Sequence, residues 1–366
     1  MTPTTYRNGW TAALLMASAT LCSHARAEGS VLLYGTVDAA ASYVSNIKGH
    51  ASWQEISGVM NGNRFGIRGT EDLGGGNQAI FALENGFNVD DGTLGQGGPG
   101  ATRIFGRQAF VGLQTPIATV TLGRQYDAMF QMLAYSAGPF ISSYWLRPAV
   151  SGNLVGNNGS SADFDRLGGA RVDNAVKIAS EAIPGLALSA LYGLGEQPGA
   201  MAPGSTYSFG AHYTHEGFAG GLSYTNFKEP DGSGNYVTWG AGASYQWNAV
   251  TLNALYTNTR LTSTHDKIDV IEVSTKYQIV PSTYVGVAYS WVLPNHGTSN
   301  VILKGRRQQV GLTLDYAFSR RTDVYAAAIH QQASGGNPAQ IFTLPSNGLG
   351  FGSAQTLVSL GLRHRF

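Results

Sequence analysis

The stretch VTWGAGASYQW, residues 237–247, decides the fold class, because apolar and polar side chains alternate along it with a period of two. The apolar set is Val237, Trp239, Ala241, Ala243, Tyr245 and Trp247. Successive side chains of a β-strand point to opposite faces, so this segment predicts a strand with one apolar and one polar face. The same alternation recurs in QQVGLTLDYAF, residues 308–318. The repeated pattern predicts an all-β chain.

Composition indicates where such strands reside. Charged residues make up 12% of the chain, against roughly 25% in an ordinary soluble domain, and there are 49 glycines and 18 tyrosines. Aromatic pairs such as Tyr245/Trp247 and Tyr289/Trp291 fall near the predicted strand ends, which suits the aromatic girdles of a membrane barrel. A soluble β-sandwich also alternates, but it gives no reason for aromatics at strand ends or for the sorted connections described next.

The connections between strands alternate in length. Short turns rich in Gly, Pro, Asn or Ser are predicted at residues 71–77, 115–118, 182–185, 215–218, 247–249, 280–282 and 318–322. Longer polar segments lie at about 45–59, 88–102, 127–170, 194–204, 229–234, 261–266, 294–303 and 333–354. Eight long loops on one side and short turns on the other predict a 16-stranded antiparallel transmembrane β-barrel.

The N-terminus predicts export. Arg7 precedes an apolar run at residues 10–22, and Ala25 and Ala27 offer small residues for cleavage, so residues 1–27 are a predicted signal peptide and 28–366 a single barrel domain. The chain's one cysteine, Cys22, would leave with this peptide, so no disulfide or thiolate metal site is expected. Removing Arg7 and Arg26 leaves 21 basic against 22 acidic residues, a net charge of −1, which offers no basic excess for nucleic acid.

Several motifs resemble the general diffusion porins of β-proteobacteria, distant relatives of the enteric trimeric porins. They are LYGTVDAAASY (33–43), NRFGIRGTEDLGGGNQAIFALENGFN (63–88), GRQAFVGL (106–113), TLGRQYD (121–127) and the closing LRHRF (362–366). The resemblance implies a homotrimer in the bacterial outer membrane, in contact with its lipid and lipopolysaccharide, that passes small hydrophilic solutes and ions by passive diffusion. It also implies that the β-barrel assembly machinery recognises the terminal Phe366.

The resemblance further implies that the third loop folds into the lumen and forms a constriction. The segment 127–170 is the longest insertion in the chain, and long segments without regular structure are usually functional. Its carboxylates are Asp127, Asp163 and Asp165, and residues 129–145 contain no acid. Because opposition to basic wall residues is therefore weak, we expect weak selectivity or a preference for anions.

The basic side of the predicted constriction comes from wall arginines that match family positions. Arg64 and Arg68 lie four apart and so share one strand face with Gly66, while Phe65 and Ile67 point to lipid. An arginine at the bilayer midplane of the outer face costs roughly 2 to 4 kcal/mol, which favours the lumen. The motifs add Arg124 and Arg171, and more weakly Arg107.

Arg124 conflicts with the simple rule that apolar residues face outward. Strand parity places it with Val120 and Leu122, which leaves Thr119, Thr121 and Gly123 on the other face. We predict that the small residues of this strand pack against neighbouring subunits, so that Arg124 faces the lumen.

Two rival functions remain on the same sequence. A substrate-specific channel on the same scaffold would need a line of aromatic or charged residues along the lumen, which strand parity alone does not establish. An outer-membrane enzyme would need clustered Ser, His and Asp or paired carboxylates at the rim, and no local motif supports it, so no catalytic residue is predicted. Neither a cofactor nor a metal site is predicted.

Overall fold

The computed structural model describes residues 29–96, 103–135, 165–168, 170–295, 305–335, 338–339, 341 and 352–366. The predicted signal peptide, most of segment 127–170 and Asp163 lie outside the described residues. Among the described residues, no helix is long and apolar enough to cross a membrane.

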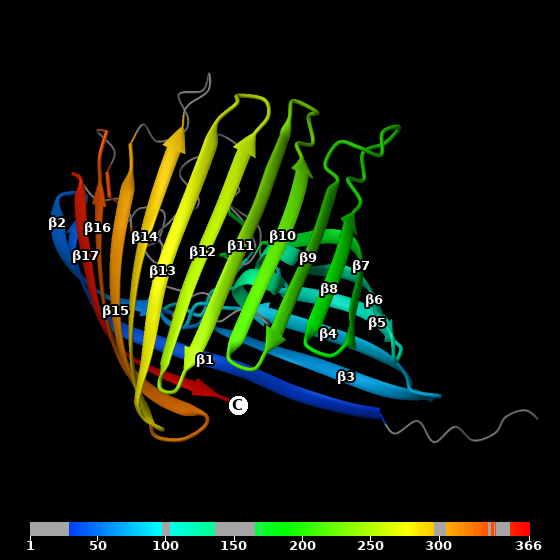
Figure 1. Ribbon diagram of the computed structural model, residues 1–366, viewed down its shortest axis with the longest axis horizontal. Coiled ribbons are helices and arrows are strands. Elements are labelled where there is room, and N and C mark those ends of the chain that lie inside the picture. Colours follow the sequence, from blue (N-terminus) through cyan, green and yellow to red (C-terminus); the bar gives the residue numbers. More distant parts are fainter. Residues whose placement is uncertain are drawn as a thin grey trace, which may run out of the picture.

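The strands form one antiparallel sheet that closes on itself, because β1 pairs with β17 (Figure 1). The first strands are β1 (Gly29–Ile47), β2 (His50–Ser57), β3 (Arg64–Gly74), β4 (Asn77–Gly86), β5 (Gln108–Gln114), β6 (Thr119–Tyr126), β7 (Arg171–Ile183), β8 (Leu186–Gly193) and β9 (Thr206–His215). The remaining strands are β10 (Phe218–Lys228), β11 (Asn235–Trp247), β12 (Val250–Leu261), β13 (Lys267–Val280), β14 (Thr283–Asn295), β15 (Arg307–Ala317), β16 (Thr322–Ala333) and β17 (Ala354–Arg365). A short π-helix, η1 (Met129–Tyr135), follows β6.

The structure describes seventeen strands, but β2 and β3 follow one another along the same edge of β1 and together form one wall strand. The wall therefore contains sixteen strands. Ser57 at the end of β2 pairs with Ala39, and Arg64 at the start of β3 pairs with Thr36. The predicted 16-stranded antiparallel barrel is therefore confirmed. Residues 58–63 join the two halves of this wall strand, and we call them the wall excursion.

The connections follow the predicted alternation with one exception. All seven predicted short turns join consecutive strands, and the connections β8/β9, β10/β11 and β12/β13 gather at the opposite end of the barrel (Figure 1). The predicted long loop at 45–59 is wrong: β1 and β2 continue as a hairpin that reverses at Lys48 and Gly49, both with positive φ. The alternation of polar and apolar residues is weak there, which made a strand look like a loop.

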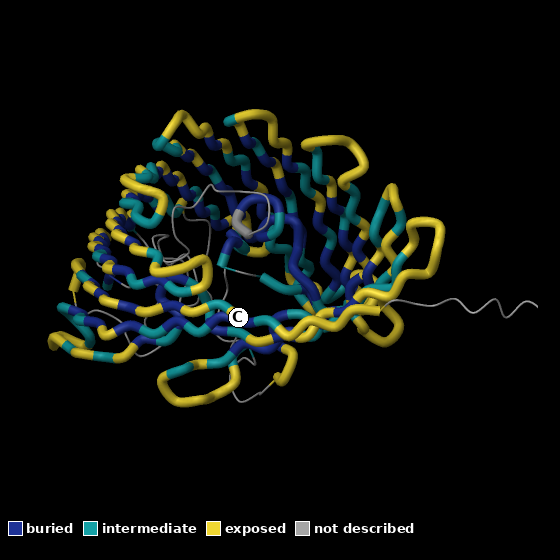
Figure 2. Tube along the Cα trace, turned by 90° about the horizontal axis from the view of Figure 1, so that it is seen from below, coloured by how far each residue is buried: buried dark blue, intermediate teal, exposed yellow. Residues whose placement is uncertain are grey.

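The two faces of the wall differ as a membrane barrel requires. On the outer face Leu360 is 67% and Leu312 48% exposed in the isolated chain, whereas Ser359 and Thr313 on the inner face are 2% and 1% exposed. Exposed apolar side chains in a band around the barrel are satisfied by lipid, and the polar inner face suits water. The buried and exposed residues alternate most regularly along the strands of the C-terminal half, such as β15 and β17 (Figure 2).

Helix η1 lies inside the barrel, against the inner face of β9, β10 and β11 (Figure 2). The main-chain N–H of Ala128 donates to Ser208 Oγ at 3.0 Å, and Ser223 Oγ donates to the Ala128 carbonyl at 3.0 Å. Leu133 is fully buried, and a Cβ added at Gly240 would lie 2.9 Å from its Cδ1. The wall glycines thus allow the helix to approach the sheet closely.

Candidate functional site

Arginines from one part of the wall project into the lumen. Arg64 and Arg68 of β3 share the inner face with Gly66, while Phe65 and Ile67 are 39% and 38% exposed on the outer face, as strand parity predicted. At a strand rise of about 3.3 Å per residue, the two arginines are separated by roughly 13 Å along the wall. They therefore present positive charge over a length of the lumen rather than at one point.

Glu84 of β4 gathers these basic groups. Its carboxylate, 1% exposed, lies 2.7 Å from Arg107 Nε and 3.8 Å from Arg64 Nε. The Tyr34 hydroxyl donates a hydrogen bond to the same carboxylate at 3.0 Å. To reach Glu84, the Tyr34 side chain lies across Gly66, where an added Cβ would meet the ring at 2.8 Å.

Arg68 extends the cluster toward the short-turn end of the wall. Its guanidinium carbon lies 5.2 Å from the centroid of the Tyr34 ring, a cation–π contact. Its side chain is exposed, and no carboxylate in the described parts of the chain lies within 4 Å of it. The cluster Arg64, Arg68, Arg107 and Glu84 thus carries three positive charges and one negative charge, a net +2. We call it the arginine wall.

The acids predicted for the third loop are buried on the far side of the lumen. Asp127 is fully buried; its carboxylate forms an ion pair with Arg166 and accepts the main-chain N–H of Phe130 at 3.1 Å. Asp165, 1% exposed, accepts the Leu167 N–H at 3.3 Å and the Thr257 hydroxyl at 3.4 Å. In the ring of sixteen wall strands, β10 stands six positions from β4.

A lysine lies near these buried acids. Lys177 of β7, 8% exposed, donates from Nζ to Gln131 Oε1 of η1 at 3.1 Å. Asp127 links η1 to the wall, because it accepts hydrogen bonds from Phe130 of η1 and from Thr225 of β10. Both Asp127 and Asp165 are buried, so neither presents an open carboxylate to the lumen.

Arg124 lies on the other side of the wall from that predicted. Its register partner is Ala109, and the next residues on that face, Val111 and Leu122, pair with each other and are 57% and 52% exposed, whereas Thr121 is 4% exposed. The ordinary apolar-out rule thus holds for β6, and the predicted reversal of its faces is wrong. The register places Arg124 on the outer face.

Arg124 is bound on that face by its neighbours. It donates from Nη1 to Asp173 at 2.5 Å and from Nε to the Gly106 carbonyl at 2.8 Å, and Arg103 binds the same Asp173 at 2.9 Å. Arg171 stands apart from the arginine wall too. It donates to the Tyr126 hydroxyl at 2.9 Å and lies 4.7 Å from the centre of the Tyr126 ring.

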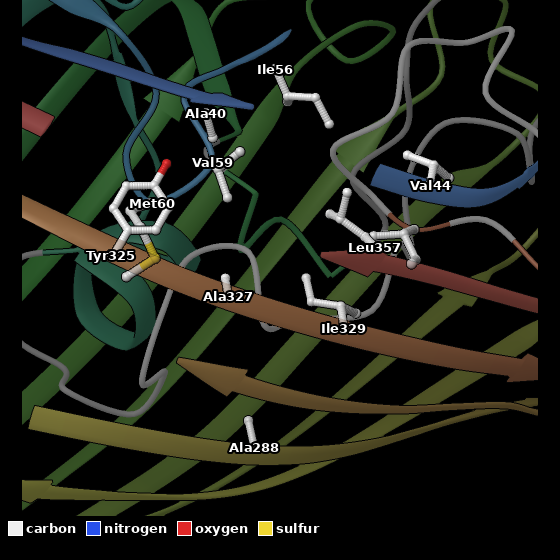
Figure 3. Close-up of a cluster of buried hydrophobic side chains, with 11 residues drawn as sticks. Ala40, Val44, Ile56, Val59, Met60, Ala288, Tyr325, Ala327, Ile329 and Leu357 are labelled. Carbon is white, nitrogen blue, oxygen red and sulfur yellow. The ribbon is translucent and has the colours of Figure 1, made fainter. Parts of the chain in front are cut away.

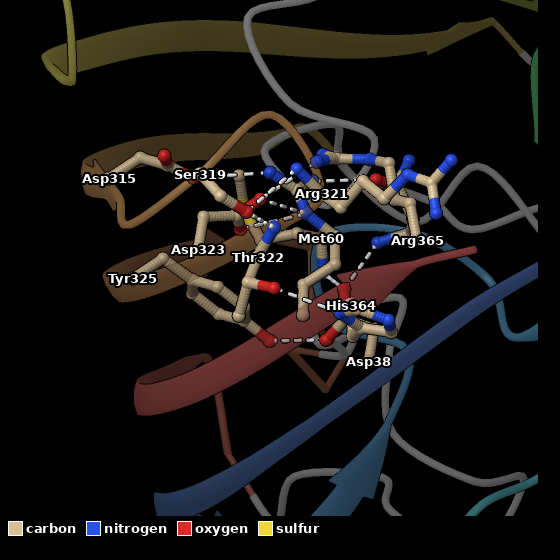
Figure 4. Close-up of polar contacts among 12 residues, drawn as sticks. Asp38, Met60, Asp315, Ser319, Arg321, Thr322, Asp323, Tyr325, His364 and Arg365 are labelled. Atoms are coloured by element: carbon tan, nitrogen blue, oxygen red, sulfur yellow. Dashed lines mark hydrogen bonds and ion pairs between the residues drawn. The ribbon is translucent and has the colours of Figure 1, made fainter.

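A second polar network of the described lumen wall was not predicted. Arg363 of β17 binds Asp323 at 2.9 Å, Asp315 at 3.2 Å and the Asn61 side chain at 2.6 Å, while Arg365 binds Asp323 at 2.8 Å. Tyr325 donates to Asp38 Oδ1 at 2.6 Å (Figure 4). Strand parity was the available signal for Arg363 and Asp315, which alternate with outward apolar neighbours, but parity does not say which charges meet.

Acids of the outer loops are held by local turns. A hydrogen bond from the Thr93 hydroxyl, at 2.6 Å, and one from its N–H lower the pKa of Asp91. The Ser233 N–H, at 2.9 Å, lowers the pKa of Asp231. In the parts of the chain that the structure describes, no three His, Cys, Asp or Glu side chains are grouped to hold a metal ion.

Comparison with known sequences gives a consistent result. The profile of a family described as Gram-negative porin matches residues 11–336. An outer membrane porin protein of Bordetella pertussis is 44% identical over 118 residues, and outer membrane porin protein 32 of Delftia acidovorans is 33% identical over 147. The matched stretches span only 30% and 39% of those proteins. The major outer membrane protein P.IB of Neisseria lactamica is 24% identical over 93% of this chain and 95% of its own.

Solved structures share the fold. The anion-selective porin from Comamonas acidovorans superposes with a TM-score of 0.75 at 22% identity, covering 93% of this chain and 100% of that one. The trimer form of OmpT from Vibrio cholerae superposes with a TM-score of 0.63 at 16% identity, covering 92% and 99%.

Proposed function

The chain belongs to the family of Gram-negative porins, and from that premise we propose that it forms a water-filled channel in the outer membrane for passive diffusion of small hydrophilic solutes, with a preference for anions. The arginine wall carries this proposal. Arg64 and Arg107 share the Glu84 carboxylate there, and Arg68, stacked on the Tyr34 ring, has no acidic partner among the described residues. A ring or patch of fixed charge in a narrow aqueous passage raises the local concentration of counter-ions.

The placement of the acids supports the same preference. A transverse field across the lumen needs open carboxylates opposite the arginines, but the described acids of the third loop, Asp127 and Asp165, are buried against the wall. Arg166 neutralises the charge of Asp127. The proposed constriction therefore consists of Arg64, Arg68 and Arg107, without Arg124, and Arg171 joins it only as a peripheral positive charge. Asp163 lies outside the described residues.

The relatives support both the chemistry and the assembly. The Comamonas structure is named as anion-selective, and one of the Vibrio structures is described as a trimer. We propose that this chain also forms a homotrimer, and that its outer face contacts outer-membrane lipid and lipopolysaccharide. We also assign Phe366 as the signal for the barrel assembly machinery. Its main chain exchanges hydrogen bonds with Gly35, and its ring covers that glycine at the end of β17.

A substrate-specific channel is the second candidate, because the arginine wall runs along the lumen and continues through Tyr34. Stacked aromatic and basic groups along a pore bind a solute better than isolated charges do. No catalytic role belongs to either proposal, since the family is one of channels.

Single-channel recording of refolded residues 28–366 in a planar bilayer tests the proposal. Large ohmic steps that close in thirds are expected for a trimeric diffusion channel. Small steps that a particular anionic solute blocks would replace it with the substrate-specific channel, and inserted protein without conductance would contradict both.

A further inference from the structure

The wall excursion leaves the barrel wall because it is too long for its place. Between the pairs Ser57–Ala39 and Arg64–Thr36, strand β1 offers only residues 37 and 38, whereas the chain opposite supplies the six residues 58–63. Such an insertion can bulge to either face of a sheet. Its direction has to be read from its contacts.

Those contacts place the excursion on the luminal side. Asp38 shares the inner face with its register partner Arg363, since the adjacent Leu362 is 53% exposed on the outer face. The Asp38 carboxylate accepts the main-chain N–H groups of Met60 at 2.9 Å and Asn61 at 2.7 Å. Met60 and Asn61 therefore lie over the inner face, above Asp38.

The wall stays closed beneath the excursion because Asn63 substitutes for a strand residue. Its side-chain amide accepts the Asp38 N–H and donates to the Asp38 carbonyl at 3.0 Å, the two bonds that a paired strand residue would exchange. The same amide nitrogen also donates to Ser57 Oγ at 2.7 Å. Gly58 begins the departure with φ of 73°, which favours glycine.

The excursion is fixed from several directions. The Tyr325 hydroxyl donates to the second carboxylate oxygen of Asp38, Oδ1, at 2.6 Å. Arg363 donates to the Asn61 side-chain oxygen at 2.6 Å. Val59 and Met60 are 0% and 4% exposed and pack with Tyr325 and neighbours from β1, β16 and β17 (Figure 3). An apolar cluster inside a barrel whose interior is normally polar occupies volume that water would otherwise fill.

The other flank of the excursion meets the arginine wall. The Gly62 carbonyl accepts a hydrogen bond from Arg64 Nη1 at 3.1 Å. A Cβ added at Gly62 would lie 3.3 Å from Arg107 Nη1, so this glycine lets the guanidinium approach. The excursion therefore fills the space between the Asp38 network and the arginines, at the level of Arg64.

We propose that residues 58–63 form a second constriction of the channel, borne by the wall itself and independent of the third loop, and that the Asp38 carboxylate is the positioning group that holds it in the lumen. This inference rests on the proposed function, because it requires an open channel. It makes the excursion a determinant of pore size and of the orientation of Arg64 and Arg107.

Labelling of a single cysteine tests the placement, because the closest atom to a Cβ at Gly62 is the end of the flexible Arg107 side chain. Refolded residues 28–366 lack Cys22, so Gly62→Cys carries a single thiol. Reaction with a bulky anionic methanethiosulfonate should lower single-channel conductance by about half or more, since the modified side chain would fill the neck. The matched control is Leu360→Cys, 67% exposed on the outer face, whose reaction should leave conductance unchanged. A Gly62→Cys channel that does not react, or reacts without losing conductance, would overturn the proposal.

Shortening the excursion tests its effect on size. In one variant the dipeptide Thr-Ser replaces residues 58–63, so that residues 37 and 38 of β1 each gain one strand residue to pair with. Single-channel conductance should rise about 1.5-fold or more, because the neck widens. Asp38→Ala should shift conductance in the same direction, whereas Thr313→Ala, on the inner face outside the network, should match the wild type. Unchanged conductance in both variants rejects the second constriction. A wild-type barrel that inserts without conducting would contradict the channel itself, and with it this inference.

Discussion

Gly361→Ala should destabilise the barrel through one side chain. The Tyr325 ring lies across Gly361 on the neighbouring strand, and a Cβ added there would collide with Tyr325 Cζ and with its hydroxyl oxygen. The ring must move, which breaks the 2.6 Å hydrogen bond from Tyr325 to Asp38. Overpacking and the loss of a bond to a charged acceptor together predict a loss of about 3 kcal/mol.

The assay is urea unfolding of the refolded protein in lipid vesicles, followed by tryptophan fluorescence, in a double-mutant cycle with Tyr325→Ala. Once the ring is absent, the three atoms nearest to the added methyl group are gone, so Gly361→Ala should cost no more than about 0.5 kcal/mol in that background. Equal losses with and without Tyr325 would refute the contact as the cause. They would mean instead that alanine is unfavourable at this strand position for reasons of backbone alone.

Three further predictions concern the lumen. Gly66→Ala should displace Tyr34 from Glu84 and lower unfolding stability by about 1 to 2 kcal/mol in the same urea assay; a wild-type midpoint would contradict the close approach of that ring. Arg68→Glu should move the zero-current potential in a KCl gradient toward cation preference, more strongly at low salt because screening is weaker there, and Arg320→Glu in the exposed turn after β15 is the matched control. Arg166→Gln leaves Asp127 buried without its partner and should cost about 3 to 5 kcal/mol, seen as a lower melting temperature; an unchanged one would mean that the ion pair does not anchor η1.

Strand parity and turn chemistry could be predicted from the sequence because both are local. Alternation along residues 308–318 and the Gly- and Pro-containing turns depend on neighbours in the chain, and the barrel follows once enough of them repeat. The inward direction of Arg64 and Arg68 followed in the same way. These features need no knowledge of which strands meet.

The parts that could not be predicted depend on contacts between distant segments. Residues 58–63 look like loop sequence, and their inward course is set by Asp38, Tyr325 and Arg363 from strands at both ends of the chain. Arg124 was misplaced because its family motif outweighed the apolar parity of Leu122. The burial of Asp127 required its pairing with Arg166, which is remote in sequence, so its acidic character alone did not indicate an open carboxylate.

The central claim is that the arginine wall gives the neck an excess of positive charge. The most direct test is the zero-current potential of the wild-type channel across a tenfold KCl gradient, recorded at low ionic strength so that fixed charges are least screened. A potential of the sign set by chloride permeation is the result predicted. A potential of the sign set by potassium would contradict the account, because it would require open carboxylates to outweigh Arg64, Arg68 and Arg107 in the neck.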